Sequence, residues 1–334
     1  MRVSGLLTRS GGCLLLVLGN LTAQFCLAQT ATPSAWPNRP IRVVVPYPAG
    51  GYYDLVARVI GNKFPDALGQ PAVVENRVGA NAIVGTEFTA KSAPDGYTIM
   101  VGGIGPHAIN PGLYPKLPYD AQRDFLPLVH VANQPTILVV PVSDPARTLR
   151  ELLESARIRP GQISFASNGS GSTPHLAAEM MASATGVKFN HVPFKGSAPA
   201  VTAVLGSQVN LLFGTASDVM SHVQAGKLRA LAVTSPRRLP ALPELPTAAE
   251  AGVSGYEASA WFAYFAPAGV PREIVQRLNV EINRIMEQPD VRDRLTAQGT
   301  TVLVGGSPEQ LASYQRSEII KWARVVKESG ARAD

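Results

Sequence analysis

Short apolar runs alternate along the chain with segments in which apolar residues recur at helical spacing. The run at 41–46 is rich in valine and predicts a buried strand of a parallel sheet. A loop over 47–53 follows, and the apolar positions from Leu55 to Leu68 then repeat at helical spacing. Further strands of this kind are expected at 72–75, 97–101, 163–166 and 209–213. Together these units predict an α/β protein with parallel sheets.

The C-terminal part of the chain, from Ile274 onward, is expected to be mostly helical. Helix starts are signalled by capping-box patterns at Thr148, Thr247 and Ser307. Two segments are candidate crossovers between domains: 125–140, which contains two strand-like runs around 133–135, and the extended segment 256–266. We therefore expect a discontinuous lobe I, a lobe II between its two parts, and, as the alternative, two sequential domains. The expected ranges are 29–133 and 257–334 for lobe I, and 134–256 for lobe II.

Residues 1–28 carry the features of a secretory signal peptide. Arg2 and Arg9 precede a short apolar run, and small residues precede a cleavage point after Ala28. The run is too short to cross a bilayer, although a membrane anchor remains the alternative. Cleavage would remove both cysteines and lower the net charge from +6 to 6 − 2 = +4. We therefore expect an exported, periplasmic protein without thiol chemistry.

The charge distribution and the motifs exclude several classes of function. No block of Lys and Arg is present, which argues against a nucleic-acid partner. No phosphate-binding loop of the P-loop or dinucleotide type is present, so no nucleotide cofactor is expected. The histidines lie in separate segments without metal-ligand spacing, and we expect no metal. Serine hydrolysis through Ser170 or Ser172 stays open, although no G-x-S-x-G elbow supports it.

Two neutral loops rich in hydrogen-bond donors are the best candidates for ligand binding. The first spans 48–54, and the second spans 167–173. In open α/β sheets such loops lie at the carboxyl ends of strands, where helix N-termini bind anions without a cationic side chain. Asp54 is expected to cap its helix, with general-base action as the alternative. His175 is expected to steady the second loop.

Several motifs, in this order, resemble the extracytoplasmic solute-binding receptors of tripartite tricarboxylate transporters, the Bug family. The matching runs are 36–42, 45–51, 94–98, 170–176, 192–196, 225–233 and 246–252. The resemblance covers the chain from about Trp36 to the C-terminus. It implies a periplasmic binding protein of type II-like fold, with two α/β lobes and a ligand cleft between them.

The resemblance also implies a function and a site. It implies a non-enzymatic receptor that holds a small carboxylate, such as a dicarboxylate, tricarboxylate, amino acid or aromatic carboxylate, partly through bridging waters. The expected partners are the membrane permease subunits of the transporter, and no cofactor is implied. The expected ligand-binding residues are Pro48, Ala49, Gly50, Gly51, Tyr52, Tyr53, Asp54, Gly103, Ile104, Ser167, Asn168, Gly169, Ser170, Gly171, Ser172, Thr173, His175, Gly214, Thr215 and Ala216.

Two departures from the family pattern fall where ligand identity would be set. Tyr52 and Tyr53 stand where small residues are usual, and Gly214 stands where an Asp is common, with Asp218 further on. We expect the tyrosines to line the pocket, where they would shorten it or contact an aromatic or longer carboxylate. A receptor that signals to a membrane sensor kinase remains an alternative to transport.

Overall fold

A computed structural model describes residues 36–297 and 301–332. The predicted signal peptide at 1–28 lies outside the described residues. The first predicted unit is confirmed, because β1 (Ile41–Val45) pairs in parallel with β2 (Ala72–Asn76) and with β3 (Thr98–Gly103). β1 and β3 are almost wholly buried, which explains their largely apolar sequences. Within the described residues, no helix is both long and apolar enough to cross a membrane.

The sheet continues through two antiparallel strands into a second parallel group. The strand order is β2-β1-β3-β9-β4-β7-β5-β6, with β8 and β10 also paired to β4. β5 pairs in parallel with β6 and β7, whereas β7 and β8 are antiparallel to β4. The bounds of the remaining strands are β4 Phe125–Pro141, β5 Ser164–Ser167, β6 Asn190–Pro193, β7 Leu211–Thr215, β8 Leu228–Val233, β9 Ser259–Pro267 and β10 Val302–Leu303.

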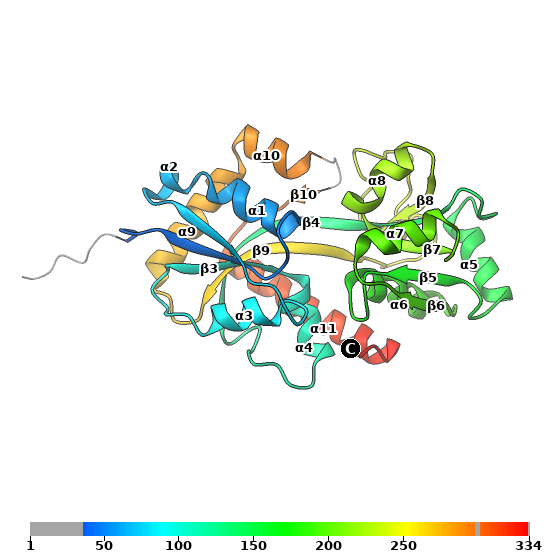
Figure 1. Ribbon diagram of the computed structural model, residues 1–334, viewed down its shortest axis with the longest axis horizontal. Helices are drawn as coiled ribbons and strands as arrows, with labels where there is room; N and C mark the ends of the chain where they lie inside the picture. The colour runs from blue at the N-terminus through cyan, green and yellow to red at the C-terminus, as the bar shows by residue number, and fades with distance from the viewer. Residues whose placement is uncertain (1–35, 298–300, 333–334) are drawn as a thin grey trace, which may run out of the picture. The chain divides into compact units, whose positions relative to one another are not determined.

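The two predicted crossover segments form the long strands that join these groups. Residues 125–141 make one 17-residue strand, not two short ones, and it pairs with β9 from Phe125↔Pro267 to Pro135↔Ser259. From Thr136 onward the same strand pairs with β7 instead. In Figure 1, β4 and β9 run from the group around β1–β3 to the group around β5–β8. The exact lobe boundaries stay a prediction, because residues Trp36–Asp334 form one compact unit.

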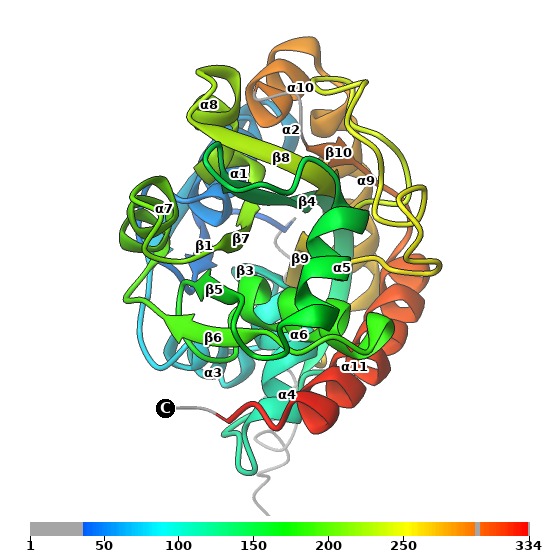
Figure 2. The ribbon, with the colours of Figure 1, turned by 90° about the vertical axis from the view of Figure 1, so that its right-hand side faces the viewer.

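Helices cover both groups of strands. Figure 2 shows α5 and α6 near β5 and β6, and the long α11 passing along α4 and α6, which it contacts. The predicted helical C-terminus is confirmed by α9, α10 and α11. The helix bounds are α1 Tyr52–Gly61, α2 Phe64–Leu68, α3 Ile83–Ala90, η1 Gly105–Ile109 (a π-helix), α4 Asn110–Leu113, α5 Leu149–Ile158, α6 Thr173–Thr185, α7 Ser197–Leu205, α8 Ala216–Gln224, α9 Arg272–Met286, α10 Pro289–Thr296 and α11 Pro308–Ser329.

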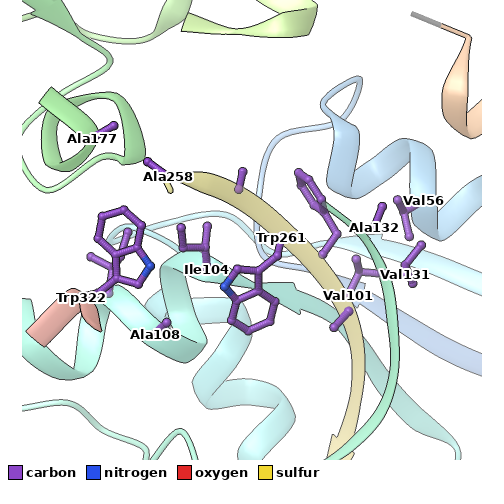
Figure 3. Packing of buried hydrophobic residues seen from close by; sticks show 14 of the residues in the cluster. Val56, Val101, Ile104, Ala108, Val131, Ala132, Ala177, Ala258, Trp261 and Trp322 are labelled. Carbon is purple, nitrogen blue, oxygen red and sulfur yellow. The ribbon is translucent and has the colours of Figure 1, made fainter. Parts of the chain in front are cut away.

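Two buried tryptophans anchor α11 against β9. The indole N–H groups of Trp261 and Trp322 both donate to Glu318 Oε2, at 3.1 and 2.9 Å. Figure 3 shows the nitrogen-bearing edges of the two rings facing each other within the apolar cluster. Glu318 also forms an ion pair with Lys321. A charged acceptor shared by both N–H groups therefore satisfies polar atoms that burial would otherwise leave unpaired.

Several local predictions are wrong. Gly103 and Gly214 lie inside β3 and β7 and not in loops, and Ala216 opens α8. The capping-box hydrogen bonds between Thr247 and Glu250 form, but they close a turn and no helix follows. The box at Ser307 is confirmed.

Asp54 does not cap its helix. α1 begins at Tyr52 with Gly51 as its N-cap, so Asp54 is the third helical residue. The tyrosine pair is compatible with the first helical turn, and the helix therefore starts earlier than the N-cap preference of Asp predicts.

Candidate functional site

A cavity of about 370 Å³ lies where the carboxyl ends of strands from both groups meet. Its floor contains Gln134 of β4 together with Ala260 and Phe262 of β9. Its walls come from the β1–α1 and β3–η1 segments on one side, and from the β5–α6 and β7–α8 segments on the other. The lining residues are Tyr47, Gly51, Tyr52, Tyr53, Asn81, Ile104, Gly105, Ile109, Gln134, Asn168, Gly171, Ser172, Thr173, Pro174, Ser197, Thr215, Ser217, Asp218, Ala260 and Phe262.

The N-termini of α1, α6, α7 and α8 converge on this cavity. The lining includes the N-caps Gly51, Ser172 and Thr215, and it includes Ser197 at the start of α7. Unpaired backbone N–H groups and the positive ends of helix dipoles are therefore directed at one space. Among the described residues that line the cavity, none is Lys, Arg or His, and Asp218 is the only ionisable carboxylate. A bound anion would therefore be stabilised here by backbone groups.

Asp54 holds the loop before α1 in place. Its Oδ2 accepts from the Gly50 N–H at 3.0 Å and from Arg58 Nε at 2.9 Å, and its Oδ1 accepts from Asn76 Nδ2 at 3.0 Å. Burial raises the pKa of Asp54, but these hydrogen bonds lower it by more, so the pKa lies below its ordinary 3.8. Asp54 does not line the cavity. It is therefore an ionised brace for the loop and not a residue of the cavity lining.

Three tyrosines and Phe262 form an aromatic wall. Tyr47 and Tyr53 stack with ring centroids 4.3 Å apart, and Phe262 contacts Tyr52 and Tyr53 at 4.5 and 4.6 Å. The Tyr52 hydroxyl donates to the Leu295 carbonyl at 3.0 Å. Burial raises the pKa of Tyr47 to about 12 and raises the pKa of Tyr53 well above its ordinary value, so both hydroxyls are neutral.

Glycines allow these rings to lie against the backbone. A Cβ at Gly103 would lie 2.1 Å from the Trp261 carbonyl oxygen and 2.9 Å from the Tyr53 hydroxyl. A Cβ at Gly105 would lie 2.3 Å from the Tyr47 hydroxyl. The glycines at 103 and 105 are thus needed for the aromatic wall, whereas Gly103 itself does not line the cavity.

The loop before α6 is held by hydrogen bonds within itself and by a pair of stacked histidines. Ser172 Oγ donates to the Gly169 carbonyl at 2.7 Å, and the Gly171 N–H donates to His175 Nδ1 at 2.9 Å. His175 stacks on His191 with centroids 3.8 Å apart, and His191 Nε2 lies 2.6 Å from Ser167 Oγ. Burial, with the nearby His191, lowers the pKa of His175 to about 4. His175 is therefore a neutral acceptor that fixes the loop backbone, as expected from the sequence.

The β7–α8 segment contributes a carboxylate. The Thr215 hydroxyl donates to Asp218 Oδ2 at 2.6 Å, and both residues line the cavity. Gly214 is directed elsewhere, because a Cβ there would lie 2.3 Å from Val219 Cγ1. The acid in this segment therefore enters the cavity from the first turn of α8 and not from the end of β7.

The structure brings together some of the residues expected from the sequence and not others. Those that line the cavity are Gly51, Tyr52, Tyr53, Ile104, Asn168, Gly171, Ser172, Thr173 and Thr215. Those that do not line it are Pro48, Ala49, Gly50, Asp54, Gly103, Ser167, Gly169, Ser170, His175, Gly214 and Ala216. Most of the second group lie beside a lining residue in sequence and shape its loop.

Gln134, Ala260 and Phe262 were missed by the sequence reasoning. They lie on β4 and β9, which the sequence identified as crossovers between domains and not as a ligand-facing floor. Ser197, Ser217 and Asp218 were also missed. Ser217 and Asp218 belong to the first turn of a helix that follows a predicted strand, and that position could have identified them, whereas the strand before Ser197 was itself not predicted. Within the described residues, no group of three or more His, Cys, Asp or Glu could hold a metal ion.

Comparison with known proteins identifies the class. The family model described as "Tripartite tricarboxylate transporter family receptor" matches residues 56–331. Protein BugT of Bordetella pertussis is 39% identical over 320 residues, covering 96% of this chain and 98% of BugT. A protein from the tcbD–tcbE intergenic region of a Pseudomonas species is 42% identical, covering 88% of this chain and 87% of that protein.

Solved structures agree with this result. R. palustris Rpa4515 with adipate superimposes with a TM-score of 0.78 at 36% identity, covering 89% of this chain and 99% of that one. The periplasmic binding protein BugD gives 0.75 at 33% identity, with coverage of 89% and 99%. MatC from Rhodopseudomonas palustris with bound malate gives 0.75 at 33% identity, with coverage of 87% and 99%.

The chain belongs to the tripartite tricarboxylate transporter receptor family, and the resemblance to Bug proteins is confirmed. The expected fold class, α/β of the type II-like periplasmic binding protein kind, is confirmed as well.

Proposed function

We propose that this chain is a periplasmic receptor that binds a small carboxylate in the cavity between its two groups of strands. The observation that carries the proposal is the convergence of the N-termini of α1, α6, α7 and α8 on one space without a Lys or Arg. Such N-termini stabilise anions through unpaired N–H groups and the helix dipole. The hydroxyl of Thr173 and the amide of Asn168 add neutral donors.

The related structures support the chemical class of ligand. Rpa4515 is bound to adipate and MatC is bound to malate, and both ligands are small carboxylates. The cavity of about 370 Å³ is of the size used by small-molecule sites. Waters would bridge those backbone donors that the ligand does not reach directly.

Binding is proposed to close two lobes over the ligand. Lobe I would comprise 29–133 and 257–334, and lobe II would comprise 134–256. β4 exchanges β9 for β7 just after Pro135, and its ladder with β9 ends at Ser259; a hinge between those ranges would lie at these positions. The closed form would then be recognised by the membrane permease subunits of a tripartite transporter.

The receptor is proposed to release its ligand chemically unchanged. Ser172 Oγ donates to the Gly169 carbonyl, and the acceptor nitrogen of His175 is occupied by the Gly171 N–H. Ser167 lies 2.6 Å from His191, but Ser167 is fully buried and does not line the cavity. No serine is thus both exposed to a ligand and paired with a free base in the described part of the loop.

Export is proposed to use residues 1–28 as a signal peptide cleaved after Ala28, which would give the mature chain a net charge of +4. N-terminal sequencing of the protein recovered from the periplasm tests this point. A mature N-terminus at residue 29 is expected, and an intact Met1 would contradict the export proposal.

A thermal-shift screen tests the binding function. Small mono-, di- and tricarboxylates are added to the purified chain, because a ligand that binds only the folded state raises the apparent melting temperature. Native mass spectrometry then counts bound molecules. We expect one carboxylate per chain, recovered unchanged; turnover of the ligand, or no shift with any carboxylate, would overturn the proposal.

A further inference from the structure

We infer that the ligand carries a hydrogen-bond-donating group, an ammonium in the strongest case, which lies against Asp218 while its carboxylate lies at the helix N-termini. The inference rests on the proposed function and narrows it to amino-carboxylates. It is based on the residues that line the cavity, chiefly on the side chains of Asp218 and Gln134.

Asp218 is a carboxylate in a cavity that otherwise offers donors. Its Oδ2 accepts from the Thr215 hydroxyl at 2.6 Å. Among the described residues, no Lys, Arg or His side chain forms an ion pair with it. Arg294 of α10 lines an adjoining hollow that Asp218 also borders. The carboxylate therefore retains acceptor capacity that one neutral hydroxyl does not satisfy.

Gln134 supplies the second, independent observation. Its side chain is 2% exposed and lines the cavity floor, and its Nε2 has no hydrogen-bond partner. A buried amide N–H without a partner is costly, and a ligand oxygen in the cavity would satisfy it. Gln134 pairs with Ala260 of β9, and it precedes by two positions Thr136, whose partner is Thr215.

Donor and acceptor therefore lie on the same part of the site. The strand register brings the Gln134 position close to the β7–α8 junction, which carries Thr215 and Asp218. A ligand that fills this part of the cavity has to present an oxygen to Gln134 and a donor to Asp218. An ammonium satisfies Asp218, and any ligand oxygen nearby satisfies Gln134, while the carboxylate at the other end lies at the helix N-termini.

A second carboxylate would be disfavoured at Asp218. The two negative charges would repel each other in a partly desolvated cavity. Such repulsion affects which ligand is preferred more than it affects the overall affinity. We therefore expect the site to distinguish dicarboxylates from ω-amino acids of the same length, which differ only in the charge at one end.

Isothermal titration calorimetry at pH 7 tests the inference with matched pairs. Each pair contains a dicarboxylate and the ω-amino acid of equal length, for example adipate and ε-aminocaproate. The proteins are the parent, Asp218→Asn, Asp218→Ser and a control, Asp66→Asn, whose acid is exposed on α2. Asn at 218 keeps an acceptor for the Thr215 hydroxyl, and circular dichroism confirms that each variant is folded.

We expect the parent and the control to bind the amino acid of at least one pair more tightly than the dicarboxylate. We expect Asp218→Asn and Asp218→Ser to shift that ratio by about tenfold or more toward the dicarboxylate. If the substitutions change the affinity for both ligands of a pair equally, the inference is overturned. An Asp218–Arg294 contact made on closure would produce that result. The inference is also overturned if the parent prefers dicarboxylates and the Asp218 variants leave the ratio of the two affinities unchanged. Failure of every carboxylate to bind the parent and both folded variants overturns the proposed function itself.

Discussion

At the scale of single residues, the site depends on side chains that shape loops as much as on those that face the cavity. Asp54 and His175 do not line the cavity, yet each accepts a backbone N–H from the loop beside it, from Gly50 and Gly171 respectively. Preorganised loops present their remaining N–H groups without a reorganisation cost when the ligand binds. Substitution of such residues should therefore affect affinity as well as stability.

His175 should make stability depend on pH. Its pKa is about 4 in the fold, below the ordinary 6.5, so its stabilising contribution is present above 6.5 and is lost as pH falls toward 4. Among the groups that face the His175 ring, His191 lowers its pKa further. Burial raises the pKa of Glu179, which gives a contribution of opposite sign that is lost as pH rises.

Urea unfolding of the parent and of His175→Asn at pH 7 and pH 5 measures this effect. The parent should lose more unfolding free energy between the two values than the variant. The buried His107 and His130 are common to both proteins, so their contributions cancel in the comparison. His222→Asn is the control, since that ring is only partly buried on α8. Equal losses in parent and His175→Asn would show that the ring does not titrate in this way.

Tyr52 should set the length of the ligand. It lines the cavity, packs on Phe262 and is tied to the Leu295 carbonyl through its hydroxyl. Tyr52→Ser removes the ring and opens space, so the ranking in a thermal-shift screen should move toward longer carboxylates. Tyr97→Ser, a tyrosine outside the cavity, is the control. An unchanged ranking for Tyr52→Ser would remove this residue from the specificity account.

At the scale of elements, the strand–loop–helix units position the donors, and Asp54 tests one unit. Asp54→Ala removes the acceptor for the Gly50 N–H and the partner of Arg58 and Asn76. The unfolding free energy should fall by about 1–2 kcal/mol, and carboxylate affinity should fall as well. The control is Glu273→Ala, an exposed acid in the first turn of α9. Unaltered carboxylate affinity in folded Asp54→Ala would contradict the role of the loop.

The Trp261–Glu318–Trp322 contact tests how α11 is held on β9. Glu318→Ala leaves two buried indole N–H groups and Lys321 without their acceptor, and should cost about 2–4 kcal/mol of unfolding free energy. Glu318→Gln keeps a carbonyl acceptor and should cost less. Urea unfolding measures both changes. Similar losses of unfolding free energy in the two variants would show that the size or charge of Glu318, and not its hydrogen bonds to the indoles, determines the stability.

The sequence predicts the strand–loop–helix order well because apolar periodicity is a local signal. The sequence predicts a residue's role poorly where that role depends on a contact with residues distant in sequence. Gly103 is required by the Trp261 carbonyl and the Tyr53 hydroxyl, which no local pattern reveals. Gln134 lies close to the point where β4 exchanges β9 for β7, and no local pattern shows that it lines the cavity. The capping pattern at Thr247 forms its hydrogen bonds but begins no helix, because tertiary context overrides the local preference.

At the scale of the whole molecule, two strands join the groups that carry the opposing walls of the cavity. Both β4 and β9 run between these groups, and α11 also contacts both α4 and α6. Closure is proposed to bend the two strands near Pro135 and Ser259. A net charge of +4 after cleavage would also draw anions toward the cleft, an effect that rising salt concentration weakens.

A crystal structure of the protein with the carboxylate that stabilises it most tests the central claim directly. The account predicts the ligand carboxylate in the cavity, with its oxygens hydrogen-bonded, directly or through one water, to backbone N–H groups at the starts of α1 and α6. A carboxylate held elsewhere on the surface, or held mainly by a Lys or Arg side chain, would contradict it.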